Sequence, residues 1–384
     1  MNTIQRAYKF RLYPTPEQAD QLARTFGCAR FVYNHFLRVR MDGFFKDKER
    51  IGYNETARRL TVLKQQPETV WLCEVSNVVL QQSLRNLDTA FSNFFAKRTK
   101  YPSFKSKHGP QSARYTTSGF RIKSGELWLA KMSSPLDMRW SRKVKGEVSS
   151  VTVTKDAAGR YFASLLVTEE VEALPVVSKE SGIDLGLKDA LITSDGLVFP
   201  NPKFYVKSQK RLARAQRSLS RKKKGSKNRA KARVKVARIY AKVADSRRDW
   251  SHKLTTQLIR ENQVISAESL SVKNMVKNRS LAKAIHDVGW SEIVRQLDYK
   301  AKWYGRTFVQ IDRFYPSSKR CSCCGHTLAA LPLATRVWVC PECDTQHDRD
   351  INAAINIREA GMAILAGADM LRMHEKSTAG LAET

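Results

Sequence analysis

The chain has 384 residues and a formal net charge of +32, from 68 Lys and Arg against 36 Asp and Glu. Its hydrophobic fraction of 42% is enough for real cores, so wholesale disorder is excluded, and its length suggests about two to four domains. Charge of this size opposes compaction and brings nothing to a small-molecule enzyme, so we expect a polyanionic partner, with nucleic acid favoured over an anionic membrane surface. No apolar run approaches the ~18 residues of a membrane span, and the N-terminus lacks the apolar core of a secretion signal.

The first hundred residues combine one strand with a helical region. Residues 3–13 alternate apolar and polar side chains, which is typical of a strand, and Pro14 ends the pattern. The run Thr-Pro-Glu-Gln at 15–18 predicts a helix start with a capping box and a proline at the first helical position. Apolar residues at helical spacing follow and recur over 77–97, so residues 15–99 are expected to form a helical bundle.

Short strands are expected after a loop rich in Lys, Ser and Gly at 102–112. These strands are predicted at 119–122, 126–131, 150–154 and 161–168. A β-barrel or sandwich that strand 3–13 joins, interrupted by the helical bundle, would fit this order.

From residue 181 onward strands alternate with helices, which predicts a mixed α/β domain within an α+β multidomain chain. One strand ends near Asp184 and leads into a hairpin that turns at 194–196. The later elements are expected as a strand at 264–268, a helix at 290–304, a strand at 308–312 and a final helix from about Asp350.

The most basic stretch, 203–249, holds 19 Lys and Arg against two acids, Asp245 and Asp249. Apolar residues recur within it near helical spacing, and Gly225-Ser226 is expected to separate two helices. A charge run is usually a solvated helix face, but such faces normally mix signs. The lack of interleaved acids therefore favours a surface that neutralises phosphates. The candidate nucleic-acid contacts are Lys203, Lys207, Lys210, Arg211, Arg214, Arg217, Arg221, Lys222, Lys223 and Lys224.

Five of the seven cysteines fall within 321–343, and an odd count without a secretion signal favours a reducing compartment and a metal site. Four of them have the spacing Cys-x2-Cys-x15-Cys-x2-Cys, which is typical of a structural zinc ribbon without an open coordination position. These four are Cys321, Cys324, Cys340 and Cys343. Cys323 is the spare thiol, and His326 and His347 are alternative ligands. Chance clustering of buried cysteines is the competing explanation.

Three acids differ from the others in their sequence context. Asp184 lies on an apolar strand flanked by glycines, Glu268 ends a second apolar strand, and Asp350 opens the last helix. Acids at the ends of buried strands are costly unless they are paired or bind a metal, and clustered carboxylates are the hard oxygen ligands that Mg²⁺ prefers. Two such ions can activate a water and stabilise the leaving oxygen of a phosphodiester. The alternative is that Asp350 is a helix N-cap and that the two strand-end acids face solvent.

Several motifs together resemble the TnpB family, the OrfB proteins of bacterial insertion sequences. The resemblance covers about 360 residues in the order that the family has. Its N-terminal motifs are Arg11–Gln18, Gly27–Asn34 and Tyr101–Lys107. Its C-terminal motifs are Gly182–Gly186, Glu268, Pro316–Gly325 and His347–Ala354.

The resemblance implies a RuvC-like nuclease of the RNase H fold, with Asp184, Glu268 and Asp350 as catalytic carboxylates. Asp350 matches rather than Asp348, because it lies two residues before Asn352. One departure is Asp344, which follows the second cysteine pair where glycine is usual, although Asp tolerates a left-handed backbone better than most residues.

The family's layout predicts the domains of this chain. A wedge β-barrel is expected at 1–14 and 100–178, a helical recognition lobe at 15–99, the RuvC-like domain at 179–315 and 348–370, a zinc ribbon at 316–347 and a loose tail at 371–384.

The resemblance thus implies an RNA-guided DNA endonuclease that uses Mg²⁺ at a two-metal site and Zn²⁺ as a structural ion. Its partners would be a guide RNA from the transposon end and double-stranded target DNA, with no membrane. We expect it in the bacterial cytoplasm, associated with the nucleoid when bound to DNA. A guided DNA-binding regulator without cleavage and a strand-transfer transposase are the alternative functions.

Overall fold

The structure is a computed structural model that describes the backbone of residues 2–380 and the side chains of residues 3–368. It divides into two compact units, with the boundary after Glu170. This boundary comes earlier than the end of the wedge domain predicted at 178. The reason is that the linking segment bonds to the second unit: Leu174 N donates to Tyr304 O, and the Arg306 guanidinium donates to Leu174 O and Pro175 O.

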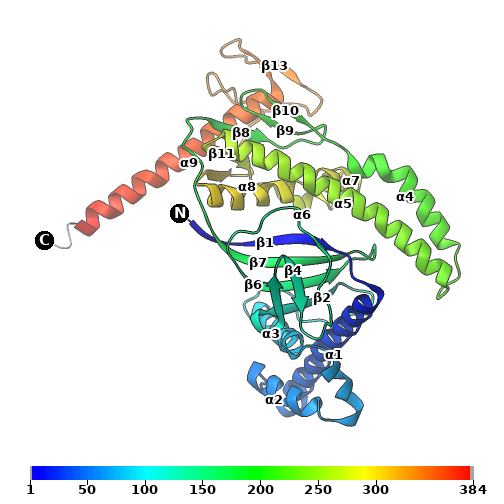
Figure 1. Cartoon of the computed structure of the whole chain (residues 1–384). Coiled ribbons are helices and arrows are strands. Elements are labelled where there is room, and N and C mark those ends of the chain that lie inside the picture. Colours follow the sequence, from blue (N-terminus) through cyan, green and yellow to red (C-terminus); the bar gives the residue numbers. More distant parts are fainter. Residues whose placement is uncertain (1, 381–384) are drawn as a thin grey trace. The chain divides into compact units, whose positions relative to one another are not determined.

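The first unit contains a five-stranded sheet with the strand order β2-β6-β7-β1-β5. Figure 1 labels β1, β2, β6 and β7 of this sheet. Its strands are β1 (Asn2–Leu12), β2 (Gln111–Thr116), β5 (Met138–Arg139), β6 (Glu147–Lys155) and β7 (Tyr161–Val171). A separate hairpin joins β3 (Phe120–Lys123) and β4 (Glu126–Leu129). The first strand therefore joins the later ones as predicted, whereas the closed wedge barrel stays a prediction.

The helical part of this unit lies between β1 and β2 in the chain. Its helices are α1 (Pro16–Asp47), α2 (Tyr53–Leu63), the 3-10 turn η1 (Pro67–Glu74) and α3 (Asn77–Phe95). The predicted capping box at Thr15 and Gln18 is confirmed, because each side chain accepts a hydrogen bond from the other's backbone N–H. Phe36, Leu80 and Leu84 are fully buried in the core that α1, α2 and α3 share.

The second unit contains a mixed sheet with the order β10-β9-β8-β11-β12. Its strands are β8 (Glu180–Asp184), β9 (Asp189–Thr193), β10 (Val198–Pro200), β11 (Val264–Glu268) and β12 (Thr307–Ile311). Strands β8, β11 and β12 are parallel, while β9 and β10 form the predicted antiparallel hairpin. The mixed α/β domain expected from residue 181 onward is confirmed.

Helices cover both faces of this sheet. The helices of this unit are α4 (Phe204–Ser220), α5 (Lys227–Glu261), α6 (Val272–Met275), α7 (Arg279–Val288), α8 (Trp290–Tyr304) and α9 (Arg349–Gly380). Leu258 of α5 and Leu297 of α8 share a buried core with Ile183 and Ile265 of the sheet, whereas α9 packs on the other face (Figure 1).

Helix α9 is assigned as far as Gly380, and the loose tail expected at 371–384 stays a prediction. The last four residues lie outside the described part of the chain. Within the described part, no helix has both the length and the apolar character needed to cross a bilayer.

Candidate functional site

The register of the parallel strands places Asp184 beside Glu268. Ala267 of β11 pairs with Ile183 of β8, so the next residue on each strand is Glu268 and Asp184 respectively. Adjacent strands lie about 4.8 Å apart. The two acids that the sequence singled out are therefore neighbours at the carboxyl edge of the sheet, although they are far apart in the chain.

Both acids lie on the face of the sheet that α9 covers. Side chains alternate between faces along a strand, so Asp184 shares a face with Gly182, and Glu268 with Ser266. Helix α9 touches that face closely: a Cβ added to Gly182 would lie 1.9 Å from Ala354 O, and one added to Gly361 would lie 2.0 Å from Ser266 Oγ. Glycine at these two positions is what lets the helix and the sheet approach.

Asp350 lies in the first turn of α9, one turn before the contact between Ala354 and the sheet. The helix is capped by Asp348, whose Oδ1 accepts from the backbone N–H groups of Asp350 and Ile351 at 3.0 Å. The alternative that Asp350 is itself the N-cap is therefore wrong. Its carboxylate instead pairs with the Arg336 guanidinium, with Nη1 at 3.2 Å from Oδ1 and 3.1 Å from Oδ2.

The three acids share one electrostatic environment. Burial and, to a smaller extent, the neighbouring charges of Glu268 and Asp350 together raise the pKa of Asp184 to about 7, against a smaller lowering by Arg349. Burial also raises the pKa of Glu268, and a hydrogen bond from Ser317 opposes this shift. Like charges that disfavour one another's ionised form are typical of carboxylates that share a site. Strand-end acids facing solvent would not show these shifts.

The four predicted cysteines converge. Their sulfur atoms all lie within 4.8 Å of one another, and among the described residues they are the sole set of three or more His, Cys, Asp and Glu that gathers this tightly. The carboxylates of Asp184, Glu268 and Asp350 are neighbours, but their oxygen atoms do not all lie within 4.8 Å of one another. Tetrahedral Zn–S bonds of about 2.3 Å place sulfurs roughly 3.8 Å apart. The separations of 3.6 Å for Cys321–Cys343 and for Cys324–Cys340 fit such an ion.

The backbone around the cysteines has the form of two matching turns. Gly325 N donates to Cys321 O, and Asp344 N donates to Cys340 O, each at 3.0 Å. Gly325 has φ 82° and Asp344 has φ 55°, so Asp344 does adopt the left-handed conformation expected where the family has glycine. The strands β13 (Val337–Val339) and β14 (Gln346–Asp348) complete the ribbon.

The other candidate ligands, His347, His326 and Cys323, are not part of the four-cysteine cluster. His347 is buried, and its Nε2 lies 3.0 Å from Cys321 Sγ, so its ring contacts one of the four cysteines without being part of the cluster. The His326 ring lies 3.6 Å from Glu342. Cys323 is exposed.

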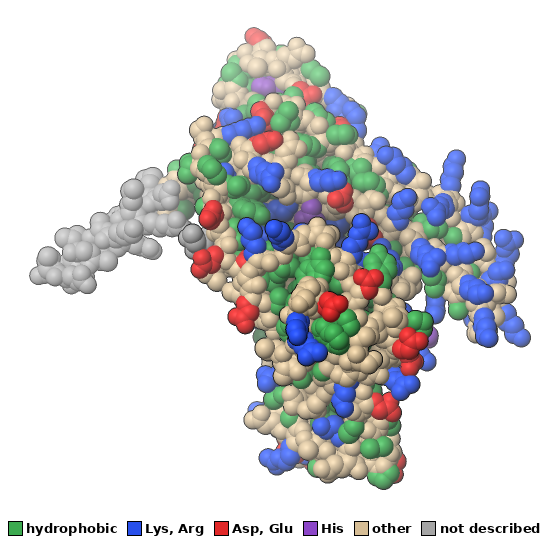
Figure 2. Space-filling model, in the orientation of Figure 1, with side chains coloured by type: hydrophobic (Ala, Val, Ile, Leu, Met, Phe, Trp, Pro, Cys, Tyr) green, Lys and Arg blue, Asp and Glu red, His purple; other side chains and the backbone are tan. Residues whose placement is uncertain are grey.

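The predicted basic surface is a helical hairpin formed by α4 and the first half of α5. Figure 2 shows Lys and Arg side chains gathered over it. All ten candidate nucleic-acid contacts are exposed, and none forms an ion pair with an acid among the described residues. Leu212, Val236 and Ile239 form a small apolar core between the two helices. The hairpin therefore holds its positive charge outward, as the sequence predicts.

Sequence reasoning missed the anchor of this hairpin. The Asp287 side chain of α7 is buried and accepts from the backbone N–H groups of Tyr205 at 2.8 Å and Val206 at 3.2 Å, in the first turn of α4. The Arg247 guanidinium lies 3.4 Å from the same carboxylate. Helix α4 begins without a side-chain cap of its own, and nothing in the sequence marks Asp287 as the partner of its first turn.

Sequence reasoning also missed the partners of the acids, Ser317 and Arg336. Ser317 belongs to the motif Pro316–Gly325, which was interpreted only as part of the ribbon. Nothing local marked Arg336, because it is one of many arginines in a basic chain.

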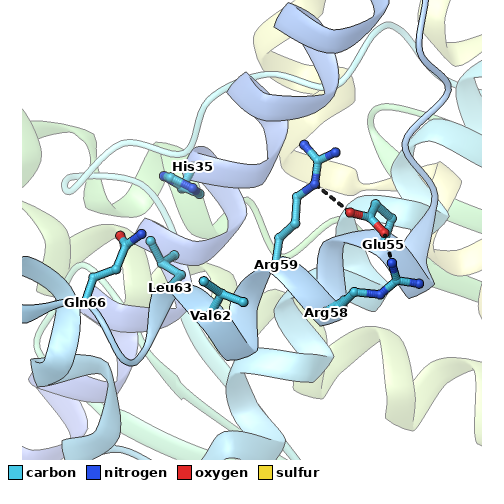
Figure 3. A pocket seen from close by; sticks show the side chains of 7 residues that line it. All are labelled: His35, Glu55, Arg58, Arg59, Val62, Leu63 and Gln66. Atoms are coloured by element: carbon cyan, nitrogen blue, oxygen red, sulfur yellow. Dashed lines mark hydrogen bonds and ion pairs between the residues drawn. The ribbon is translucent and has the colours of Figure 1, made fainter.

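A hollow of about 430 Å³ in the first unit contains none of the predicted site residues (Figure 3). Its lining is His35, Glu55, Arg58, Arg59, Val62, Leu63 and Gln66. Glu55 pairs with Arg59 at 2.8 Å and with Arg58 at 3.3 Å, so both guanidinium groups already have an anionic partner. This hollow does not have the character of an anion site.

The site combines three acids at one edge of an α/β sheet, a four-cysteine ribbon beside them and an exposed basic hairpin. These features are expected of a protein that acts on nucleic acid.

Three family models match the chain. An OrfB model described as "Helix-turn-helix domain" matches residues 1–48. The OrfB model of IS605 elements described as "Probable transposase" matches residues 164–279. A third model, described as "Cas12f1-like, TNB domain", matches residues 290–357. Within the described part of the first match, residues 2–48, the structure has strand β1 and the single long helix α1.

Relatives match nearly the whole chain. A Streptomyces pristinaespiralis protein named "Putative RNA-guided DNA endonuclease" is 48% identical over 98% of this chain and 94% of its own length. "Putative RNA-guided DNA endonuclease InsQ" of Escherichia coli K12 is 35% identical over 96% of this chain and 95% of its own length. The chain therefore belongs to the TnpB (OrfB) family of IS605-type elements.

The fold is also similar to that of a solved structure. The chain in "Cryo-EM structure of the Cas12f1-sgRNA-target DNA complex" matches 93% of this chain with a TM-score of 0.56, and the match covers 99% of that chain. The sequence identity of that match is 14%.

Proposed function

We propose that this protein is an RNA-guided DNA endonuclease with a RuvC-like site, in which Asp184, Glu268 and Asp350 hold divalent metal and direct hydrolysis of DNA phosphodiesters. The observation that carries the proposal is the geometry: strand register sets Asp184 beside Glu268, at the edge of the sheet where helix α9 begins with Asp350 in its first turn. The names of the full-length relatives support guided DNA cleavage as the activity.

The donor set fits Mg²⁺, because three carboxylates supply hard oxygen ligands and their mutual repulsion is relieved by a divalent cation. A pair of Mg²⁺ ions bound there would supply an activated water and charge stabilisation at the leaving oxygen of the phosphodiester. The chain's own residues prepare the site. Strand register holds Asp184 and Glu268 side by side, and the packing of α9 on Gly182 brings Asp350 to the same edge.

The four cysteines would hold a structural Zn²⁺. A closed set of four thiolates leaves no position for a substrate, and the small ribbon core of Cys321, Trp338 and Cys340 is too limited to fold without an ion.

The basic hairpin would hold the backbones of the guide RNA and of the guide–target duplex. Contacts to phosphate carry no sequence information, so base pairing with the guide would select the target. The wedge and helical lobes would contact a short motif beside the target. We place the protein in the bacterial cytoplasm, on the nucleoid when it is bound to DNA.

The test is cleavage by the protein purified with its co-expressed RNA, using duplexes that match or mismatch the guide and added Mg²⁺. We expect cleavage of the matched duplex alone, and its loss in Asp184→Asn. Asp189→Asn is the matched control, because Asp189 begins the neighbouring strand β9 and is not one of the three acids. Cleavage that ignores the RNA sequence, or that survives Asp184→Asn, would refute the proposal.

One observation favours a second function, DNA strand transfer: the family model over 164–279 is described as "Probable transposase". The same reaction distinguishes the two functions when the products are sequenced. Joined DNA ends would indicate strand transfer, whereas free ends that depend on the guide would indicate the endonuclease. Guided binding of the matched duplex without any cut would indicate the regulator.

A further inference from the structure

Ser317 contacts the second acid of the site from the segment that leads into the zinc ribbon. Its side chain is buried, with 6% of the residue exposed, and its hydroxyl donates a hydrogen bond to Glu268 Oε1. The two residues lie far apart in the chain and belong to different structural parts, strand β11 and the start of the ribbon. The contact therefore depends on how the ribbon is seated on the sheet.

The backbone at Ser317 is itself fixed by helix α9. Asn356 Nδ2 donates to Ser317 O at 2.8 Å and to Arg320 O at 2.6 Å. Asn352 Nδ2 donates to Arg320 O at 2.8 Å, and Asn352 Oδ1 accepts from Ser322 N at 3.0 Å. Asn352 and Asn356 are one turn apart, so one face of α9 binds the backbone of the first cysteine turn. The helix that carries the third acid thus also sets the position of the Ser317 hydroxyl.

We infer that Ser317 is a positioning residue for the proposed metal site, because its hydroxyl fixes the orientation of the Glu268 carboxylate. One oxygen of that carboxylate is held by Ser317, and the other, Oε2, has no hydrogen-bond partner among the described residues. A carboxylate held at one oxygen presents the other in a defined direction. Hydrogen bonds of this kind orient metal-binding carboxylates, and their loss typically weakens metal affinity or activity about 10- to 100-fold.

This role goes beyond the proposed function and rests on it. It also differs from a purely structural role, in which the hydroxyl would do no more than satisfy a buried polar group. A structural role predicts that Ser317→Ala lowers stability and leaves the affinity of the folded protein for divalent metal unchanged. A positioning role predicts a loss of that affinity in protein that is still folded and still contains zinc.

The experiment compares four forms of the full chain in its complex with RNA and target duplex: wild type, Ser317→Ala, Ser317→Thr and Ser318→Ala. Mn²⁺ serves as the probe, and its binding is followed by the electron paramagnetic resonance signal of the free ion. Zinc content and the binding of RNA are measured on the same samples. Ser318 is the matched control, because it is the adjacent serine and its hydroxyl has no partner among the described residues.

We expect Ser317→Ala to bind Mn²⁺ roughly 10-fold more weakly or worse, with a parallel fall in the single-turnover cleavage rate and with zinc and RNA binding unchanged. Ser317→Thr keeps a hydroxyl and should recover most of the affinity, while Ser318→Ala should match the wild type. Wild-type Mn²⁺ affinity in folded Ser317→Ala would overturn the inference.

If Ser317→Ala loses zinc or fails to fold, Mn²⁺ binding is measured instead on Ser317→Cys. This variant keeps a side chain of similar size but donates a weaker hydrogen bond. Weakened Mn²⁺ binding in that variant supports the inference, and wild-type binding overturns it. Failure of the proposed function gives a different result: DNA cleavage would survive Asp184→Asn, independently of how the Ser317 variants bind Mn²⁺.

Discussion

The closest approach of α9 to the sheet gives the sharpest test of how the site is assembled. In Gly182→Ala the new methyl carbon would lie 1.9 Å from Ala354 O and 2.5 Å from Arg358 N. A carbon needs about 3.3 Å from a carbonyl oxygen, so α9 and β8 must separate by ~1.4 Å. Overpacking a well-packed contact costs about 1–3 kcal/mol. We expect the upper end, because both obstructing atoms are backbone and no side chain can rotate away.

The displacement should affect cleavage more than stability. Helix α9 carries Asp350, which we propose as a catalytic acid, and a shift of ~1 Å in such a group can cost about 100-fold in rate. Gly367→Ala is the matched control, because it makes the same change in the same helix with nothing within 4 Å of the new methyl group. It should stabilise the chain by up to ~1 kcal/mol through helix propensity.

Urea unfolding of the full chain and single-turnover cleavage measure the two effects of Gly182→Ala. The prediction is a fall in the unfolding midpoint together with a cleavage rate about 100-fold lower, while Gly367→Ala keeps the wild-type rate. A Gly182→Ala protein that is as stable and as active as the wild type would show that α9 does not set the position of Asp350.

Three further predictions concern other parts of the molecule. Burial lowers the pKa of Lys300 from 10.5 to about 8, so the folded state loses this proton at a lower pH than the unfolded state does. Stability should therefore rise as the pH increases between these two values, by less than the ~3 kcal/mol of the full shift, because three hydrogen bonds from Lys300 Nζ favour its charged form. Lys300→Met should abolish that rise, which is seen by comparing urea midpoints of the two proteins on either side of pH 8. Removing zinc with a chelator should make residues 316–347 sensitive to protease and should stop DNA cleavage, and added Zn²⁺ should reverse both effects. A ribbon that resists protease without metal would contradict the zinc assignment. Replacing Arg211, Arg214 and Arg217 together by Gln should lower the slope of log affinity for RNA against log salt by ~2, and an unchanged slope would remove the hairpin from the RNA interface.

Much of the architecture could be predicted because local patterns carry it. The strand at 264–268 and the helix at 290–304 were predicted with the bounds that β11 and α8 have in the structure, since each is a strong apolar pattern between clear breaks. The capping box and the left-handed Asp344 also follow from local backbone chemistry. Cysteine spacing identified the cluster because two short turns fix the positions of four sulfur atoms.

The missed features depend on tertiary contacts between residues far apart in the chain. Helix α7, at 279–288, was not predicted because its ten residues form a short pattern within a polar stretch. No sequence pattern indicates that the Asp287 carboxylate caps α4, or that Arg336 pairs with Asp350. Sequence patterns therefore predict where a helix or strand begins more reliably than they predict the tertiary contacts of its side chains.

Chain topology explains why the ribbon and the acids belong together. Strand β12 ends at Ile311, which pairs with Glu268, so the chain leaves the sheet at the edge where the acids lie. It returns to the same edge at Arg349, where α9 begins. Any module inserted between these points must sit over that edge, and its two connecting segments start and finish beside carboxylates. Ser317 on the outgoing side and Arg336 near the return therefore reach Glu268 and Asp350, so metal binding by the ribbon and acid geometry at the sheet should be coupled.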